Sequence, residues 1–278
     1  MKKKPTSKDW LPLSRGRKGA QEVPTGDAFR PEWLDFERGI RVGNLRPHER
    51  ITQILKHRLE EEYGTGFVTD RWGRGVYWQW ICWLPRADRE AKPVSNTINF
   101  GCAKLYISID RSKRIFQCGL AVERGFAGGT PSFPGILLQP DWDWHRLMKQ
   151  CAAGTALDGE LCRLVNREGF TAAIVGAGGR TWTGKELVSA REVRDAARKA
   201  PRDAWSGFDL YYPMPESEVR ATSGYDLVQG ILGAFSEVLH VMNACMQVTL
   251  APRLSPSVPG SGTPSGKSRA PRQEPSGR

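Results

Sequence analysis

Three groups of residues in this sequence have types and spacings that are typical of chemical sites. The first is the segment 179–185, which reads G-x-x-x-x-G-K and lies between an apolar stretch and a charged stretch. Loops of this pattern cradle phosphates with backbone N–H groups and a lysine. Glu186 stands where the Ser or Thr that binds Mg²⁺ would follow the lysine. The pattern therefore favours a glycine-rich turn over a nucleotide site, and anion binding by the turn from Gly179 to Lys185 stays open.

The second group is Asp70, Glu90 and Lys92, which lie on either side of a hydrophobic stretch. These three positions resemble the PD-(D/E)xK nucleases, in which two carboxylates hold Mg²⁺ and a lysine steadies the attacking water. The resemblance implies catalytic roles for the three residues and Mg²⁺ as the cofactor. No proline precedes Asp70, and the other two residues follow Pro85 in a polar stretch. A solvated loop explains them more simply, so the nuclease is carried as an alternative.

The third group is Asp141 and His145, which lie one helical turn apart. This spacing permits two ligands on one metal ion, but no third ligand is identifiable. Acidic residues are also expected in the first turn of a helix, where the macrodipole is positive. The sequence therefore predicts no metal site and, outside the nuclease alternative, no cofactor.

An aromatic stretch, 77–80, reads Tyr-Trp-Gln-Trp and has arginines on both sides. Exposed aromatic rings beside cations form platforms on which nucleic-acid bases stack. Because aromatic residues occupy both faces of this expected strand, burial is the favoured interpretation and stacking the alternative. The cations that would form a basic rim around such a platform are Arg71, Arg74, Arg86, Arg111, Lys113 and Arg114.

The alternation of apolar residues indicates which elements position these groups. Leu105, Ile107 and Ile109 share one strand face, and Phe116, Cys118, Leu120 and Val122 continue it after a polar turn. Helices are expected at 47–63, 141–166, 185–200 and 224–250, and strands at 76–84, 136–138, 170–175 and 208–212. The fold class is therefore α+β, with an antiparallel-rich sheet at about 67–123, later short strands and flanking helices.

Positive charge is concentrated at the two ends of the chain. Of the formal net charge of +11, residues 1–18 carry +6 and residues 253–278 carry +4, which leaves +1 between them. The expected organisation is a flexible basic arm (1–28), a single α+β domain (29–252) and a disordered Ser/Pro/Gly-rich tail (253–278). The terminal cations expected to contact nucleic acid are Lys2, Lys3, Lys4, Lys8, Arg15, Arg17, Lys18, Lys267, Arg269 and Arg272.

Composition excludes some classes of protein. No apolar run approaches the length that spans a bilayer, and no apolar segment follows the first lysines as in a signal peptide. The six cysteines are scattered, and no pair has the C-x-x-C spacing of zinc or redox sites. Buried free thiols in a cytoplasmic protein are therefore expected, with no membrane partner.

Three functions of different classes follow. The favoured one is a non-enzymatic accessory protein whose basic tails tether a near-neutral body to nucleic acid or another polyanion, because cationic arms release counterions from phosphates. The second is the divergent Mg²⁺-dependent nuclease. The third is an interaction module that pairs with a protein partner, or with a second copy, through the apolar stripe of helix 224–250.

Overall fold

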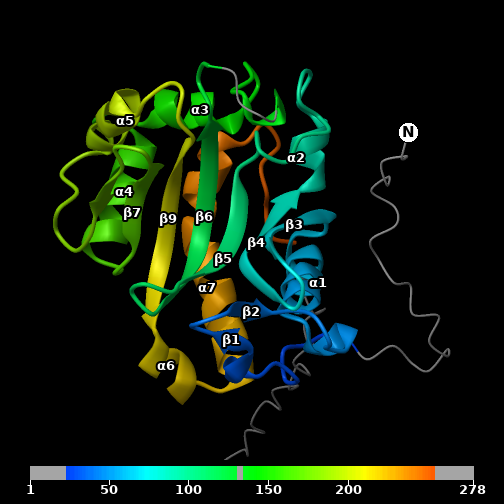
Figure 1. Cartoon of the computed structure of the whole chain (residues 1–278). Coiled ribbons are helices and arrows are strands. Elements are labelled where there is room, and N and C mark those ends of the chain that lie inside the picture. Colours follow the sequence, from blue (N-terminus) through cyan, green and yellow to red (C-terminus); the bar gives the residue numbers. More distant parts are fainter. Residues whose placement is uncertain (1–22, 130–133, 254–278) are drawn as a thin grey trace, which may run out of the picture.

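The computed structural model describes residues 23–129 and 134–253, which form an α+β fold around one sheet (Figure 1). This part of the chain contributes nine strands, and every pairing between them is antiparallel. The strands are β1 (Leu34–Asp35), β2 (Gly39–Arg41), β3 (Phe67–Arg74), β4 (Tyr77–Pro85), β5 (Lys104–Asp110), β6 (Ile115–Gly125), β7 (Thr171–Gly176), β8 (Arg180–Trp182) and β9 (Ser206–Pro215).

The order of the strands places a late strand in the middle of the sheet. Along the sheet the order is β1-β2-β4-β5-β6-β9-β7-β8, and β3 pairs with β4 outside this path. Strand β9 therefore lies between β6 and β7, with Ala121 opposite Asp209 and Ala173 on its other side. Residues that are far apart in the sequence thus become neighbours on the sheet.

Seven α-helices belong to the described residues. They are α1 (Ile51–Tyr63), α2 (Arg86–Glu90), α3 (Asp143–Gln150), α4 (Ala156–Asn166), α5 (Ala190–Lys199), α6 (Glu216–Ala221) and α7 (Gly224–Cys245). The longest, α7, lies behind the sheet in Figure 1 and contacts β6, α3 and α4. Its apolar residues belong to the main hydrophobic core. Ser223 caps its first turn by accepting from the N–H of Asp226, as expected for a capping side chain.

The two faces of the sheet differ in what covers them. The predicted core-facing parity of β5 and β6 is confirmed, because Leu105, Ile107, Phe116 and Leu120 all pack in the main core together with helix residues. A second, smaller cluster on the other face contains only strand and loop residues. Its buried members are Cys82, Leu84, Cys102, Tyr106, Ala121 and Tyr211. One face is thus covered by helices, and we call the other the open face.

Several predicted boundaries shift for local reasons. The helix predicted at 47–63 is a 3₁₀ turn at Pro47–Glu49 followed by α1, because Arg50 between them has an extended backbone. The helix predicted at 185–200 begins only at Ala190, where Ser189 caps it. The strand predicted at 136–138 does not form: Ile136 ends a 3₁₀ turn, and Leu137 makes an isolated bridge with Phe126. Strand β9 runs through Pro213, beyond the predicted end at 212.

The ends of the described region are anchored. The turn near Gly26 lies against Val228 of α7, so residues 23–28 of the predicted arm contact the body. At the other end, the N–H of Arg253 donates to the carbonyl of Glu62. The predicted terminal cations from Lys2 to Lys18 and from Lys267 to Arg272 lie outside the described residues. Within the described ranges, no helix combines the length and apolar character needed to cross a membrane.

Candidate functional site

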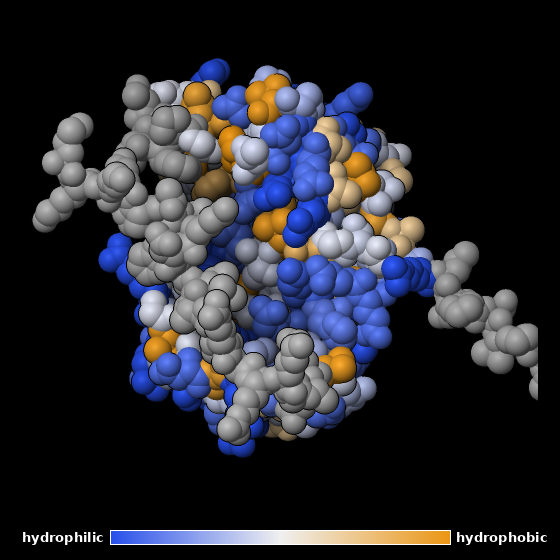
Figure 2. Space-filling model, turned by 90° about the vertical axis from the view of Figure 1, so that its right-hand side faces the viewer, coloured by the Kyte–Doolittle hydropathy of each residue, from blue (hydrophilic) through white to orange (hydrophobic). Residues whose placement is uncertain are grey.

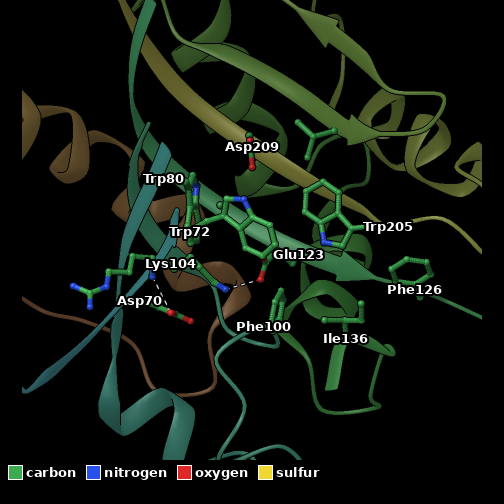
Figure 3. Close-up of a pocket in the computed structure, with 13 residues that line it drawn as sticks. Asp70, Trp72, Trp80, Phe100, Lys104, Glu123, Phe126, Ile136, Trp205 and Asp209 are labelled. Carbon is green, nitrogen blue, oxygen red and sulfur yellow. Dashed lines mark hydrogen bonds and ion pairs between the residues drawn. The ribbon is translucent and has the colours of Figure 1, made fainter. Parts of the chain in front are cut away.

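A cleft of about 820 Å³ opens on the open face of the sheet (Figure 3). Aromatic side chains form most of its walls, and charged side chains lie at its base. Its lining residues are Asp70, Arg71, Trp72, Trp80, Phe100, Lys104, Ala121, Glu123, Phe126, Ile136, Val175, Trp205 and Asp209. This volume lies within the range of about 300–1,000 Å³ that is typical of small-molecule sites.

Strand register creates the base of the cleft. Ala121 of β6 stands between Lys104 of β5 and Asp209 of β9, directly opposite both. Glu123 follows two residues along β6 on the same face, diagonal to both charged neighbours. The small side chain of Ala121 leaves space between the longer ones. We call Lys104, Glu123 and Asp209 the cleft floor.

Lys104 and Glu123 form an ion pair, with 2.5 Å between Nζ and Oε2. Burial by itself lowers the pKa of Lys104, but the neighbouring Glu123 carboxylate outweighs this and raises the pKa above its usual value. The Nζ of Lys104 also lies 5.7 Å from the ring centre of Trp80 and 5.5 Å from that of Phe100. The lysine therefore keeps its charge and is unavailable as a neutral nucleophile.

Asp209 has a different environment although it lies on the same floor. Burial, followed by the negative charge of Glu123, raises the pKa of Asp209 to about 7, while Lys104 and Tyr106 act in the opposite direction. The buried hydroxyl of Tyr106 lies beside this carboxyl but makes no hydrogen bond of normal geometry with the described residues. Near neutral pH, Asp209 therefore exists in both protonated and ionised forms.

The walls at the mouth of the cleft expose aromatic rings. Trp72 is 72% exposed and Trp205 is 36% exposed, although large aromatic residues are usually buried. Trp72 lies opposite Trp80 in the β3–β4 pairing, next to a register shift at Gly73. Trp80 in turn stacks on Tyr106, with ring centres 6.1 Å apart. Exposed rings that border a cavity are typical of surfaces that bind planar ligands.

The aromatic stretch 77–80 is half-buried, so full burial, the favoured interpretation of the sequence, does not hold. The Arg71 guanidinium lies 4.0 Å from the ring centre of Trp78, and Arg38 stacks on Tyr77 at 4.6 Å. Both guanidinium groups therefore lie against aromatic rings, and Arg38 also pairs with Asp35 at 2.6 Å. The alternative expectation, aromatic rings combined with cations, describes this edge of the sheet better.

The predicted basic rim divides into two groups. Arg71 lines the cleft, and Arg74 lies at the end of the same strand. Neither makes an ion pair within the described residues, and the same holds for Arg86 at the start of α2. The cations of the β5–β6 turn have partners instead. Arg111 donates to the Glu37 carbonyl, Lys113 lies 3.8 Å from Asp110, and Arg114 pairs with Glu216 at 2.5 Å.

The three residues of the nuclease alternative do not share one environment. Asp70 lines the cleft and accepts a hydrogen bond from Asn99, whereas Glu90 is largely exposed at the end of α2. Lys92 is completely buried between Asp88 and Asp143, at 2.6 and 2.9 Å. We call Asp88, Lys92 and Asp143 the buried triad. Its lysine has no access to a substrate at Asp70, so the geometry lends this alternative no support.

The other two sequence patterns have structural roles in the described part of the chain. In the G-x-x-x-x-G-K segment, Arg180–Trp182 is strand β8, and Glu186 accepts from the N–H of Thr183. No helix begins at Lys185. Asp141 accepts from Ser95 and Val94, while His145 contacts the carbonyl of Gln139. No group of three or more His, Cys, Asp or Glu side chains among the described residues is arranged to hold a metal ion.

Sequence reasoning missed the cleft floor, although one signal for it was present. The predicted parity of β5 and β6 places Lys104 and Glu123 on the face opposite the core. Polar residues on that face are expected in any half-exposed sheet, so parity alone did not distinguish them from solvated residues. Asp209 lies in another predicted strand, and only the position of β9 beside β6 brings it to the same site.

Comparisons with known proteins identify no relative of this chain. No family model matches the chain, and neither the curated proteins nor the solved structures include a match.

Proposed function

We propose that the protein associates with nucleic acid and that the cleft takes up an unpaired base. The observation that carries this proposal is the set of aromatic rings around a cavity of about 820 Å³: Trp72, Trp80, Phe100 and Trp205. Bases stack on aromatic side chains whatever their sequence, with about 1–3 kcal/mol for each stacked base. The charged floor supplies donors and acceptors for the polar edge of a base.

Cations beside the cleft support a polyanionic ligand. Arg71 lines the cavity and Arg74 follows on the same edge strand, and neither is neutralised by a carboxylate of the described residues. The body therefore contributes phosphate contacts of its own, in addition to those expected of the terminal segments. The charges of +6 in residues 1–18 and +4 in residues 253–278 would add affinity that falls steeply with salt.

The tails and the cleft are expected to affect binding differently, and this difference provides the test. Binding of single-stranded and duplex oligonucleotides is measured by fluorescence anisotropy over a range of salt concentrations. A chain lacking residues 1–22 and 254–278 should bind both nucleic acids more weakly and with a shallower salt dependence, yet keep a preference for single strands.

Replacement of both Trp72 and Trp205 by alanine should remove that preference and leave the salt dependence unchanged. Tyr225→Ala is the matched control, because it removes an exposed aromatic residue at the start of α7, outside the cleft lining. A double variant that discriminates between single and double strands as well as the full chain does would refute uptake of a base.

Pairing through helix 224–250 has less support than base uptake. The apolar stripe of α7, including Ile231, Phe235 and Val238, is buried in the core of its own chain. A partner would have to displace that core or use another face of the helix. Cytoplasmic placement remains a prediction, in agreement with six free cysteines, of which five are buried.

A further inference from the structure

We propose that the cleft hydrolyses the N-glycosidic bond of the nucleoside unit whose base it holds, with Asp209 as general acid and Glu123 as general base. This inference rests on the proposed uptake of a base and adds a reaction to it. Its starting point is the cleft floor, where two carboxyl groups on adjacent strands face one cavity.

The placement of the two carboxyl groups suits this reaction. Glu123 and Asp209 are diagonal neighbours across β6 and β9, and both side chains line the same cleft. Enzymes that hydrolyse glycosidic bonds commonly use two carboxyl groups that flank the bond, one as acid and the other as base. Ala121 lies opposite Asp209 with only a methyl side chain, so the space between the two groups is open to the cleft.

The two carboxyl groups differ in charge because their partners differ. Burial raises the pKa of Glu123 above its usual value, and Lys104, 2.5 Å away, acts against this by favouring the ionised form that a base requires. Asp209 has no cationic partner at ion-pair distance within the described residues, and only the Tyr106 hydroxyl lies beside it as a donor. A pair of carboxyl groups with such unequal surroundings is the arrangement that separates an acid from a base.

The buried Tyr106 hydroxyl next to the acid restricts where the carboxyl group can lie. Tyr106 is 1% exposed, and its ring is fixed by stacking on Trp80 in the wall of the cleft. Buried hydroxyl groups normally have a partner. For Tyr106 that partner is the carboxyl group of Asp209, so the tyrosine holds the acid in place at the cleft.

The reaction balances without a metal or cofactor. Asp209 gives its proton to an acceptor atom of the base while the bond between C1′ and the base nitrogen breaks, and the bonding electrons leave with the base. The positive charge that develops at C1′ and the ring oxygen is stabilised by the Glu123 carboxylate. Water then adds to C1′ and gives a proton to Glu123, which returns it through solvent to Asp209. The products are a free base and a sugar with a hydroxyl at C1′.

The test uses the full chain and single-stranded DNA and RNA oligonucleotides of mixed sequence, in separate reactions. Free base is measured by chromatography with the protein in excess, and quenching of tryptophan fluorescence reports binding in the same samples. We expect base release from at least one of the two nucleic acids. Asp209→Asn and Glu123→Gln should each lower the rate by about 10²–10⁴-fold while quenching persists.

Ser108→Ala is the control, since Ser108 lies on the same face of β5 but outside the cleft lining. It should leave the rate unchanged. The rate of the unaltered chain should fall as the pH rises above about 7, because burial raises the pKa of Asp209 to about 7 and the acid then loses its proton. Thermal melting of each variant identifies any loss of rate that follows from unfolding.

The outcomes separate the two proposals. Quenching without release of base from either DNA or RNA would overturn the hydrolysis and leave base uptake intact. Release at an unchanged rate by the folded Asp209→Asn variant would overturn the assigned roles. Absence of quenching by both nucleic acids would overturn the proposed function and the hydrolysis with it.

Discussion

Two clusters in this protein each set a buried lysine among carboxylates, and they differ in what surrounds them. In the buried triad, Lys92 lies between Asp88 and Asp143, and all three side chains are inaccessible to solvent. In the cleft floor, Lys104 pairs with Glu123 alone, and Asp209 lies beside them at the edge of a cavity. Similar residue types therefore occupy one closed site and one open site.

The carboxyl groups of the closed site are held by groups of their own chain. The second oxygen of Asp88 accepts from the N–H groups of Gln247 and Val248, and that of Asp143 accepts from Ala103. The triad thus joins α2, the segment before β5, α3 and the residues after α7. In the open site, Glu123 and Asp209 line the cleft, and Asp209 has no cation at ion-pair distance within the described residues. Enclosure within the chain indicates a structural role, and carboxyl groups that line a cleft indicate a binding role.

The largest effect that would test this contrast is on stability. Lys92→Met leaves two buried carboxyl groups without a cation, and breaking such a pair costs about 3–5 kcal/mol. Lys104→Met should cost only about 1–3 kcal/mol, because Glu123 retains 12% exposure and water in the cleft can solvate it. Urea unfolding at neutral pH measures both. Equal losses in the two variants would show that the open site is as structural as the closed one.

Tryptophans on the two faces provide the next test. Trp83 is fully buried and donates from Nε1 to the carbonyl of Thr52, so Trp83→Ala should cost about 3–5 kcal/mol of unfolding free energy. Trp72→Ala should change that free energy by about 0.5 kcal/mol or less, since the ring is mostly exposed. The same change should weaken binding of single strands by about 1–3 kcal/mol. A Trp72 variant with lowered stability and unchanged binding would reverse the assignment.

The contrast also shows how far the sequence determines this architecture. Apolar alternation predicted the core face of β5 and β6 and the stripe of α7, because burial on one face follows directly from periodicity. The same alternation could not show that Lys92 turns inward. The pairing of Lys92 with Asp143 depends on the packing of α3 beside the segment that follows α2, and this packing has no local signature.

The cleft could be predicted only in part, for a related reason. The aromatic stretch 77–80 with the flanking Arg71 indicates a stacking surface only as the alternative to burial. The position of Asp209 depends on β9 pairing with β6 instead of with a strand adjacent in the sequence. Trp205, just before β9, reaches the cleft by the same route. Long-range strand order therefore determines the chemistry of this site.

A smaller effect concerns the cations at the edge of the open face. The affinity for single strands falls as the salt concentration rises. Arg71→Gln should make the slope of log affinity against log salt shallower by about 0.7, the value for one phosphate contact. Arg163→Gln is the matched control, because Arg163 on α4 is already paired with Glu160, Glu168 and Glu237. Identical slopes for the Arg71 variant and the unaltered chain would place the phosphate contacts of the body elsewhere.

The smallest effect concerns the pH dependence of stability. The pKa values of Asp209 and Asp143 are both raised to about 7 by burial, from a usual value of 3.8. Between about pH 4 and pH 7 the folded state therefore holds protons that the unfolded state has lost, so both residues make stability fall as the pH rises.

Asp209→Asn removes one of these two contributions, and it should flatten the decline measured by urea unfolding at a series of pH values. The change should be modest, because Asp209 borders the cleft and water there stabilises its ionised form.

In the closed site, Asp143→Asn also removes a titrating group, but it deprives Lys92 of a partner and should lower stability at every pH. An Asp209→Asn profile parallel to that of the unaltered chain would mean that this carboxyl titrates in the folded protein as it does in the unfolded one. The chemical distinction between the two clusters would then fail.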